Sequence, residues 1–179
     1  RFATTTFLII AWDVAPGALA DTIQLRRSSM NGSTQTILLK IISVLWIVWG
    51  LVHMFAGVVI VLSATPDAIA AVADAVDPEV LVGPYHEAAG ALINQHGFNL
   101  LWIGAVTTLA AVFIWRGNVF AIFTGALVGG LADVGYFLFM DLGGHVNFVP
   151  GTVMTLVSAS AVFLSLLVWN SRRSTALPS

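Results

Sequence analysis

The stretch VFAIFTGALVGGLADVGYFLFM, residues 119–140, decides the fold of this chain. It is apolar over a length that crosses the hydrocarbon core of a bilayer, which takes about 20 residues of helix. A single carboxylate, Asp133, interrupts it. A charged side chain at that depth is costly unless it is paired or hydrated. We therefore expect a membrane-spanning helix and a polar partner for Asp133 on a neighbouring helix.

The composition of the whole chain agrees with a membrane location. Of its 179 residues, 58% are hydrophobic and only 9% are charged, and the mean hydropathy is +0.94. An average soluble domain has about 25% charged residues. The net charge of -2 and the scattered basic residues argue against a nucleic-acid partner. Because cysteine is absent, disulfides, thiolate metal ligands and covalently attached haem are excluded.

Three further apolar segments accompany residues 119–140, namely residues 38–62, 98–115 and 149–169. Only three residues separate the second segment from the third, which predicts that these two helices are antiparallel neighbours. The second helix is expected to begin earlier, near Tyr85, and to project from the membrane. We predict an all-α integral membrane protein, with residues 37–170 forming a single four-transmembrane-helix bundle in the lipid bilayer and residues 171–179 a cytoplasmic tail that is disordered from Ser174 onward.

The segment of residues 1–36 is ambiguous. Its short apolar stretch loosely resembles a secretory signal, although the order of its parts is poor. Met30 stands just before the first strong apolar segment and would suit the start of the natural protein. We expect residues 1–36 to be disordered or not part of the natural product, and no function is inferred from them.

The connection between the first two spans carries a helix signal. Thr65 precedes a proline and Asp67, a pattern typical of a helix start. Ile69, Val72 and Val76 then fall on one side of the helix, which the sequence continues to Pro78. This pattern predicts a short amphipathic helix in the first outer loop, lying on the membrane or over the mouth of the bundle.

The basic residues indicate an orientation. No Lys or Arg lies between Ile41 and Trp115, whereas basic residues flank the start of the first span, the link between the second and third, and the end of the fourth. The positive-inside bias then places both termini in the cytoplasm, in an inner membrane of a bacterium. The two outer connections are acidic.

Counting helical rise from the cytoplasmic ends places polar residues at similar depth. At about 1.5 Å per residue, His53 lies roughly 20 Å from Lys40, and Asp133 lies equally far from Val119. Three more residues fall near this level, giving a polar layer of His53, Asn99, Asp133, Tyr136 and Thr155. This layer either binds a proton, an ion or a small ligand through a His–Asp pair, or locks the helices together by hydrogen bonds.

A second polar set is expected at the outer rim and consists of His86, Glu87, His96, Asp141 and His145. Imidazole and carboxylate ligands suit zinc, copper or non-haem iron, so these residues form a candidate metal-ion site. No local spacing matches a metal motif, and adjacent residues point about 100° apart on a helix. Haem is disfavoured because the count places His96 roughly 8 Å further out than His53.

Three classes of function remain open. The first is a non-enzymatic accessory or self-associating membrane subunit, because no catalytic motif is visible and Gly125 and Gly129 have the small-xxx-small spacing of contacting helices. Its partners would be other membrane subunits or a homo-oligomer. The second is ion, proton or small-ligand binding or transport through His53 and Asp133. The third is a membrane metalloprotein or oxidoreductase that uses the outer histidines.

Overall fold

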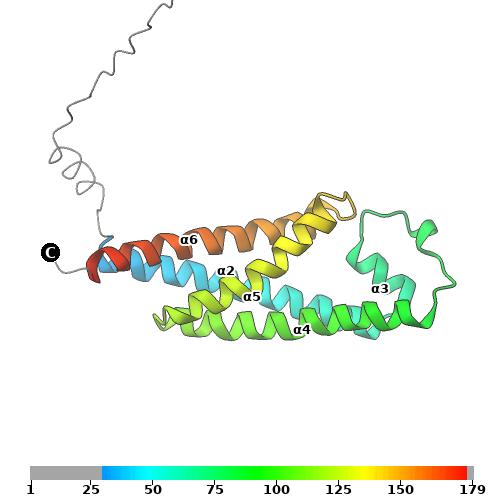
Figure 1. The fold of residues 1–179 in the computed structure, drawn as a ribbon, viewed down its shortest axis with the longest axis horizontal. Coiled ribbons are helices and arrows are strands. Elements are labelled where there is room, and N and C mark those ends of the chain that lie inside the picture. The colour runs from blue at the N-terminus through cyan, green and yellow to red at the C-terminus, as the bar shows by residue number, and fades with distance from the viewer. Residues whose placement is uncertain (1–29, 177–179) are drawn as a thin grey trace, which may run out of the picture.

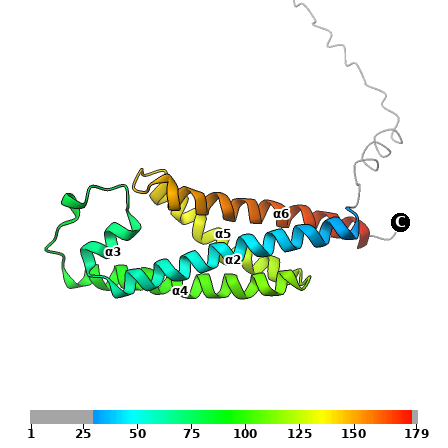
Figure 2. The same ribbon diagram turned by 180° about the vertical axis from the view of Figure 1, so that it is seen from behind.

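The computed structural model describes residues 30–176, which form helices and connections without any strand. Within this range four helices are long and apolar enough to cross a membrane. They are α2 (Gly32–Leu62), α4 (Glu87–Trp115), α5 (Phe120–Tyr136), which η2 (Phe137–Asp141) prolongs, and α6 (Val153–Ala176), which follows η3 (Phe148–Thr152). The four helices run lengthwise beside one another, and a small helix, α3 (Thr65–Val72), lies at one end (Figures 1 and 2). The prediction of an all-helical bundle with four apolar spans is confirmed.

The ends of the bundle differ from the predicted boundaries. α2 begins at Gly32, earlier than expected, because the Asn31 side chain accepts a hydrogen bond from the Thr34 N–H at 2.7 Å and caps the helix. α6 continues to Ala176, so residues 174–176 are helical where a disordered tail was expected. The Ser171 hydroxyl accepts a hydrogen bond from the Met30 N–H at 3.0 Å, which joins the two helix ends. The expectations for residues 1–29 and 177–179 lie outside the described residues.

The second spanning helix begins close to where the sequence suggested. α4 starts at Glu87, and its 29 residues extend about 43 Å, more than the ~30 Å of a hydrocarbon core. Its first N–H groups are capped by His86, whose Nδ1 accepts a hydrogen bond from the Ala88 N–H at 3.1 Å. The acidic Glu87 in the first turn suits the positive end of the helix dipole.

Glycines spaced seven residues apart let α2 and α4 approach closely. A Cβ at Gly50 would lie 2.7 Å from the Gly104 carbonyl oxygen, and a Cβ at Gly57 would lie 2.5 Å from the Gly97 carbonyl oxygen. Real Cβ atoms do not come this close, so side chains larger than hydrogen would push the helices apart. The antiparallel α2–α4 pair, side by side in both ribbon views, is therefore the tightest contact of the bundle (Figures 1 and 2).

The two glycines expected to mediate self-association pack inside the chain. A Cβ at Gly125 would lie 3.1 Å from Trp46 Nε1, and a Cβ at Gly129 would lie 2.6 Å from the Trp46 ring. Trp46 is fully buried. This face of α5 receives a tryptophan from α2 and is not free to receive a second subunit.

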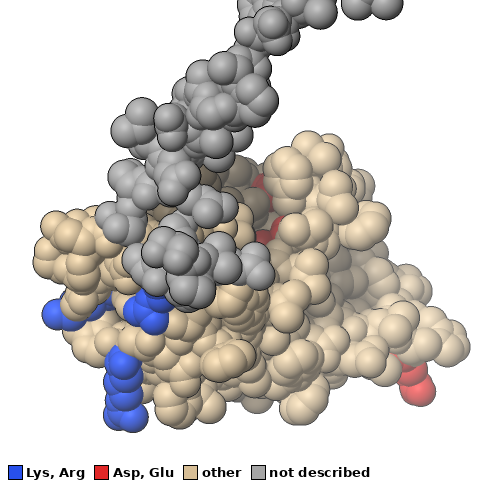
Figure 3. All heavy atoms as spheres, turned by 60° about the vertical axis from the view of Figure 1, so that its left-hand side comes forward, with Lys and Arg blue, Asp and Glu red and all other residues tan. Residues whose placement is uncertain are grey.

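The charged side chains separate to opposite ends of the bundle. We define the basic end by Lys40, Arg116 and Arg172. Figure 3 shows the blue Lys and Arg side chains gathered on one side of the molecule. Lys40 Nζ lies 5.5 Å above the centre of the Trp115 ring, a cation–π contact. We define the acidic end by the described acids other than Asp133, all in or next to the connections beyond α2 and η2: Asp67, Asp74, Asp77, Glu79, Glu87 and Asp141.

The two connections at the acidic end are hydrogen-bonded to each other. The Asn147 N–H donates to Asp74 Oδ1 at 2.7 Å, and the Asn147 amide donates to the Asp74 carbonyl at 2.9 Å. The Ala75 N–H donates to the His145 carbonyl at 3.1 Å. These bonds draw Asp74 and Ala75 away from a helical path. α3 therefore ends at Val72, and a separate helical turn, η1 (Pro78–Leu81), begins where the sequence pattern predicted the helix to end.

Candidate functional site

The buried carboxylate of α5 has a partner on α2. Asp133 is only 4% exposed, and its Oδ2 accepts a hydrogen bond from Trp49 Nε1 at 2.8 Å. Trp49 itself is fully buried. The Ser158 hydroxyl of α6 is a further hydrogen-bonding group beside the carboxylate. Helices α2, α5 and α6 thus meet at Asp133. Its Oδ2 atom has a firm hydrogen-bond donor in the Trp49 indole.

The same tryptophan orients His53. The imidazole lies one turn after Trp49 and stacks on the indole, with ring centroids 3.6 Å apart and an angle of 21° between the planes. His53 Nδ1 lies 2.8 Å from the Trp49 carbonyl oxygen. Because a carbonyl oxygen only accepts, Nδ1 must donate and therefore carries a hydrogen. The other ring nitrogen, Nε2, is left to face the site.

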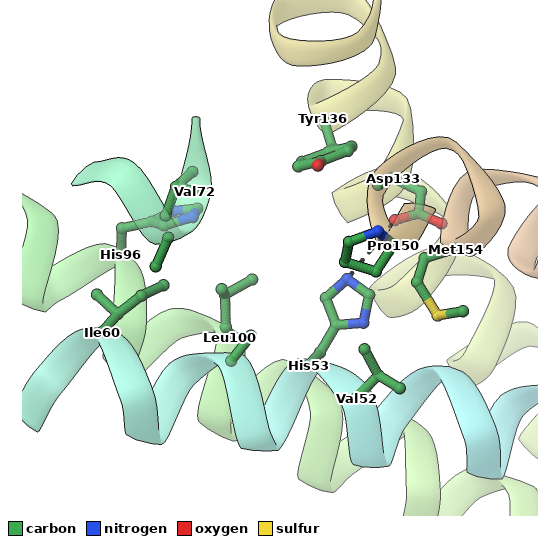
Figure 4. Close-up of a pocket in the computed structure, with 13 residues that line it drawn as sticks. Val52, His53, Ile60, Val72, His96, Leu100, Asp133, Tyr136, Pro150 and Met154 are labelled. Carbon is green, nitrogen blue, oxygen red and sulfur yellow. Dashed lines mark ion pairs between the residues drawn. The ribbon is translucent and has the colours of Figure 1, made fainter. Parts of the chain in front are cut away.

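His53 Nε2 points at Asp133 across a gap of 3.8 Å to Oδ1, which the dashed line marks in Figure 4. In a neutral ring with its hydrogen on Nδ1, Nε2 has a lone pair, so two acceptors face each other. One proton placed on either atom would turn this repulsion into attraction. A molecule with N–H or O–H groups between the two atoms would do the same.

A cavity opens beside this pair, toward the acidic end. It consists of two adjoining volumes of about 380 Å³ and about 100 Å³, which share several lining residues, among them His53, Asp133, His96 and Tyr136. The labelled side chains of Figure 4 come from α2, α3, α4, α5, η3 and α6 and surround one space, with Val72 of α3 on its outer side. The remaining walls are mostly apolar. The geometry thus combines a polar pair in the membrane interior with room for a small molecule.

The structure brings together most of the predicted polar layer. His53, Asn99, Asp133 and Tyr136 all line the larger volume. Thr155 lies elsewhere, because its hydroxyl donates to Asp141 Oδ2 at 3.0 Å, beside the Thr152 hydroxyl, which donates to Asp141 Oδ1 at 2.7 Å. These bonds anchor the end of η2 to the start of α6.

The predicted rim set is dispersed. His86 caps α4, Glu87 is exposed in the first turn, and His145 is exposed in the η2–η3 connection. Asp141 is bound by the two threonines, and only His96 reaches the cavity. Among residues 30–176, no three His, Asp or Glu side chains gather as the ligands of one metal ion would.

Two members of the site were missed by sequence reasoning. Trp49 stands one helical turn before His53 in the sequence, but its indole N–H was not identified as the partner of Asp133. His96 was placed at the outer rim, yet it lines the same cavity as His53. The available signal for Trp49 was its spacing of four residues before His53, which is also ordinary core spacing.

Asp133 also borders a groove on the opposite side of α5. This groove lies between α5 and α6, has a volume of about 650 Å³ and is lined almost entirely by apolar side chains such as Leu131, Val162 and Phe163. Because the groove runs along two spanning helices, its apolar lining resembles a surface that contacts lipid.

Comparison of the chain with known protein families, with characterised proteins and with solved structures finds no match.

Proposed function

We propose that this chain is an integral membrane protein that binds a proton at the His53–Asp133 pair. Binding of this proton depends on whether the adjoining cavity holds a ligand. One observation carries the proposal. His53 Nε2 and Asp133 Oδ1 face each other at 3.8 Å in the interior of the four-helix bundle, and both are acceptors when the imidazole is neutral and the carboxyl is ionised. An arrangement of this kind is repulsive until a proton or a donor occupies it, and intramembrane carboxylates commonly mark ion and proton pathways.

A purely structural role accounts for less of the geometry. The Trp49–Asp133 hydrogen bond at 2.8 Å already ties α2 to α5. The Ser158 hydroxyl adds a second hydrogen bond to the carboxylate. Neither bond involves His53, whose Nε2 lies 3.8 Å from Asp133 Oδ1, too far for a structural hydrogen bond, and faces the cavity. Both features suit a group that gains and loses a proton.

The orientation proposed for the protein follows from its charge separation. The basic end would face the cytoplasm and the acidic end, with the cavity, would face outward, as the positive-inside bias requires. Both termini would then be cytoplasmic, and the membrane would be the inner membrane of a bacterium. An accessory or self-associating role remains a prediction. The two glycines on which that prediction rests, Gly125 and Gly129, pack against Trp46 within the chain.

Infrared difference spectroscopy tests the proposed proton site directly. The protein is reconstituted in lipid nanodiscs, and spectra are compared between acidic and alkaline buffer in H₂O and in D₂O. We expect the carbonyl band of a protonated carboxylic acid, shifted by deuterium, that disappears in Asp133→Asn. Asp141→Asn is the matched control, because Asp141 is a partly buried carboxylate held by two threonines outside the cavity.

The result that overturns the proposal is a set of Asp133→Asn spectra that match the wild type. His53→Gln provides a second reading if Asp133→Asn fails to fold. It removes the imidazole but keeps the carboxyl group, so the band should remain and move in frequency and in its pH midpoint. An unchanged band and midpoint in His53→Gln would show that the imidazole does not share the proton.

A further inference from the structure

The gap between His53 and Asp133 has the size and polarity of a site for a nitrogen with several N–H groups. Nε2 and Oδ1 are 3.8 Å apart and both accept. A donor atom placed between them can lie about 2.9 Å from each, the usual length of an N–H hydrogen bond. At 3.8 Å a single proton on either atom gives an ion pair or a dipolar attraction, but no hydrogen bond of ordinary length. A primary ammonium group, with three N–H donors, can bond both atoms at once and still have one donor left.

The charge around the cavity favours a cation. The described side chains of Lys and Arg lie at the basic end, whereas the described acids other than Asp133 lie at the acidic end, on whose side the cavity opens. Such a one-sided distribution of charge draws cations toward the cavity and repels anions. A cation inside a membrane bundle also needs a counter-charge, and the Asp133 carboxylate supplies one.

The walls of the cavity define the rest of the ligand. The ring of Tyr136 lies above the His53–Asp133 pair in Figure 4, and an aromatic face stabilises a nearby cation. Away from the pair the larger volume is lined mainly by apolar side chains such as Leu100, Ile103 and Phe139, beside the polar His96 and Asn99. Asn99 Oδ1 already accepts a hydrogen bond from the Trp102 indole. The part of the ligand beyond its nitrogen should therefore be mainly apolar.

We propose that the cavity binds a primary ammonium ion with an apolar substituent, whose N–H groups bridge His53 Nε2 and Asp133 Oδ1 in place of the bound proton. This inference rests on the proposed proton site. The exchange is balanced, because one ammonium ion enters, one proton leaves the pair for solvent, and the charge of the site is unchanged. No covalent bond forms or breaks in the ligand.

The other titratable groups around the pair come from every neighbouring element. α4 contributes His96, α5 contributes Tyr136, η2 contributes Asp141, and the connection after α3 contributes Asp74. The α6 residues beside the pair, Met154 and Ser158, do not titrate. Asp141 and Asp74 add negative charge at the outer side and therefore favour the ammonium ion further.

Isothermal titration calorimetry with phenethylammonium measures the exchange. Titrations of the full chain in nanodiscs, in buffers of different ionisation enthalpy, give the number of protons released. We expect about one proton per bound ligand where the pair is protonated. Asp133→Asn should abolish binding and proton release, whereas Asp141→Asn, which removes only a neighbouring negative charge, should bind the ligand more weakly but still release a proton. The trimethylated analogue has the same charge but no N–H donor, so it should bind at least tenfold more weakly, the effect of about 1.4 kcal/mol.

Three outcomes would overturn the inference: no phenethylammonium binding, binding without proton release, or equal binding of the trimethylated analogue. The infrared band lost in Asp133→Asn decides separately whether the proton site exists, so failure of the ammonium site alone is recognisable. Should Asp133→Asn not fold, the wild type is sufficient. Its affinity for phenethylammonium must rise about tenfold per pH unit over the range in which the pair is protonated. A pH-independent affinity would contradict the exchange.

Discussion

At the scale of single residues, Trp49 organises the site through three different groups. Its indole N–H holds Asp133, its carbonyl oxygen fixes the hydrogen on His53 Nδ1, and its ring supports the imidazole by stacking. The neighbouring Trp46 is equally buried, but its indole N–H has no hydrogen-bond partner. The two tryptophans therefore form a natural pair for comparison.

We expect Trp49→Phe to destabilise the protein more than Trp46→Phe does. Both changes remove similar ring volume from the core, but only Trp49→Phe leaves a buried carboxylate oxygen without its donor. The difference should be about 1–3 kcal/mol, the usual cost of an unsatisfied buried group. Unfolding by sodium dodecyl sulfate in mixed micelles measures it. Equal losses in the two variants would show that the hydrogen bond at 2.8 Å contributes little.

Residue depth was predictable from the sequence, whereas direction around the helix was not. The fixed rise of an α-helix let His53 and Asp133 be placed at one level, and they lie 3.8 Å apart. Thr155 was placed near the same level by the same count, but it faces Asp141 on another side of the bundle. Depth does not tell how each helix is rotated about its own axis. Because the spans are almost entirely apolar, no periodic pattern of polar residues indicates which face of each helix points inward.

At the scale of the elements, the stability of the bundle depends on how closely α2 and α4 approach. The four glycines of this contact are visible in the sequence as two pairs with a spacing of seven residues. The sequence does not say that the two pairs meet, since either could have faced lipid or another helix. The contact was therefore missed, while the glycines of α5 drew attention because their spacing resembles a known pattern of association.

Gly50→Ala should destabilise the protein, and Gly135→Ala should not. The Cβ at position 50 would lie 2.7 Å from the Gly104 carbonyl oxygen, whereas the Cβ at position 135 has nothing within 4 Å. We expect Gly50→Ala to cost about 1–3 kcal/mol by overpacking. Gly135→Ala should be neutral or add up to about 1 kcal/mol of helix propensity. Thermal unfolding in detergent, followed by circular dichroism, compares them. A stable Gly50→Ala variant would contradict the close α2–α4 contact.

At the scale of the whole molecule, apolar length and charge distribution were sufficient to predict the number of spans. Both are sums over many residues, so errors at single positions cancel. The tertiary contacts of the acidic end were not predictable in this way, because the Asp74–Asn147 hydrogen bonds join residues 73 positions apart and depend on loop conformation. This is also why the end of α3 differed from the predicted helix.

Labelling of single cysteines tests the proposed orientation. The chain has no cysteine of its own, so Val80→Cys near the acidic end and Asn118→Cys at the basic end can be compared without background. Both positions are exposed. In intact bacterial cells, a membrane-impermeant maleimide should label Val80→Cys at once and Asn118→Cys only after lysis. Labelling in the reverse order would mean that the positive-inside bias does not set the topology here.

The hydrogen-bonded connections at the acidic end have a consequence for the time a ligand spends inside. Asp74 lies two residues after Val72, which lines the cavity, and its bonds to Asn147 hold α3 in place. A ligand that entered or left between these two connections would need these bonds to open. Since they are intact both before and after such a passage, they would slow arrival and departure by the same factor. A substitution at the Asp74–Asn147 contact would thus change the residence time of the ligand. The affinity for the ligand, which depends on Asp133 deeper in the bundle, would stay constant.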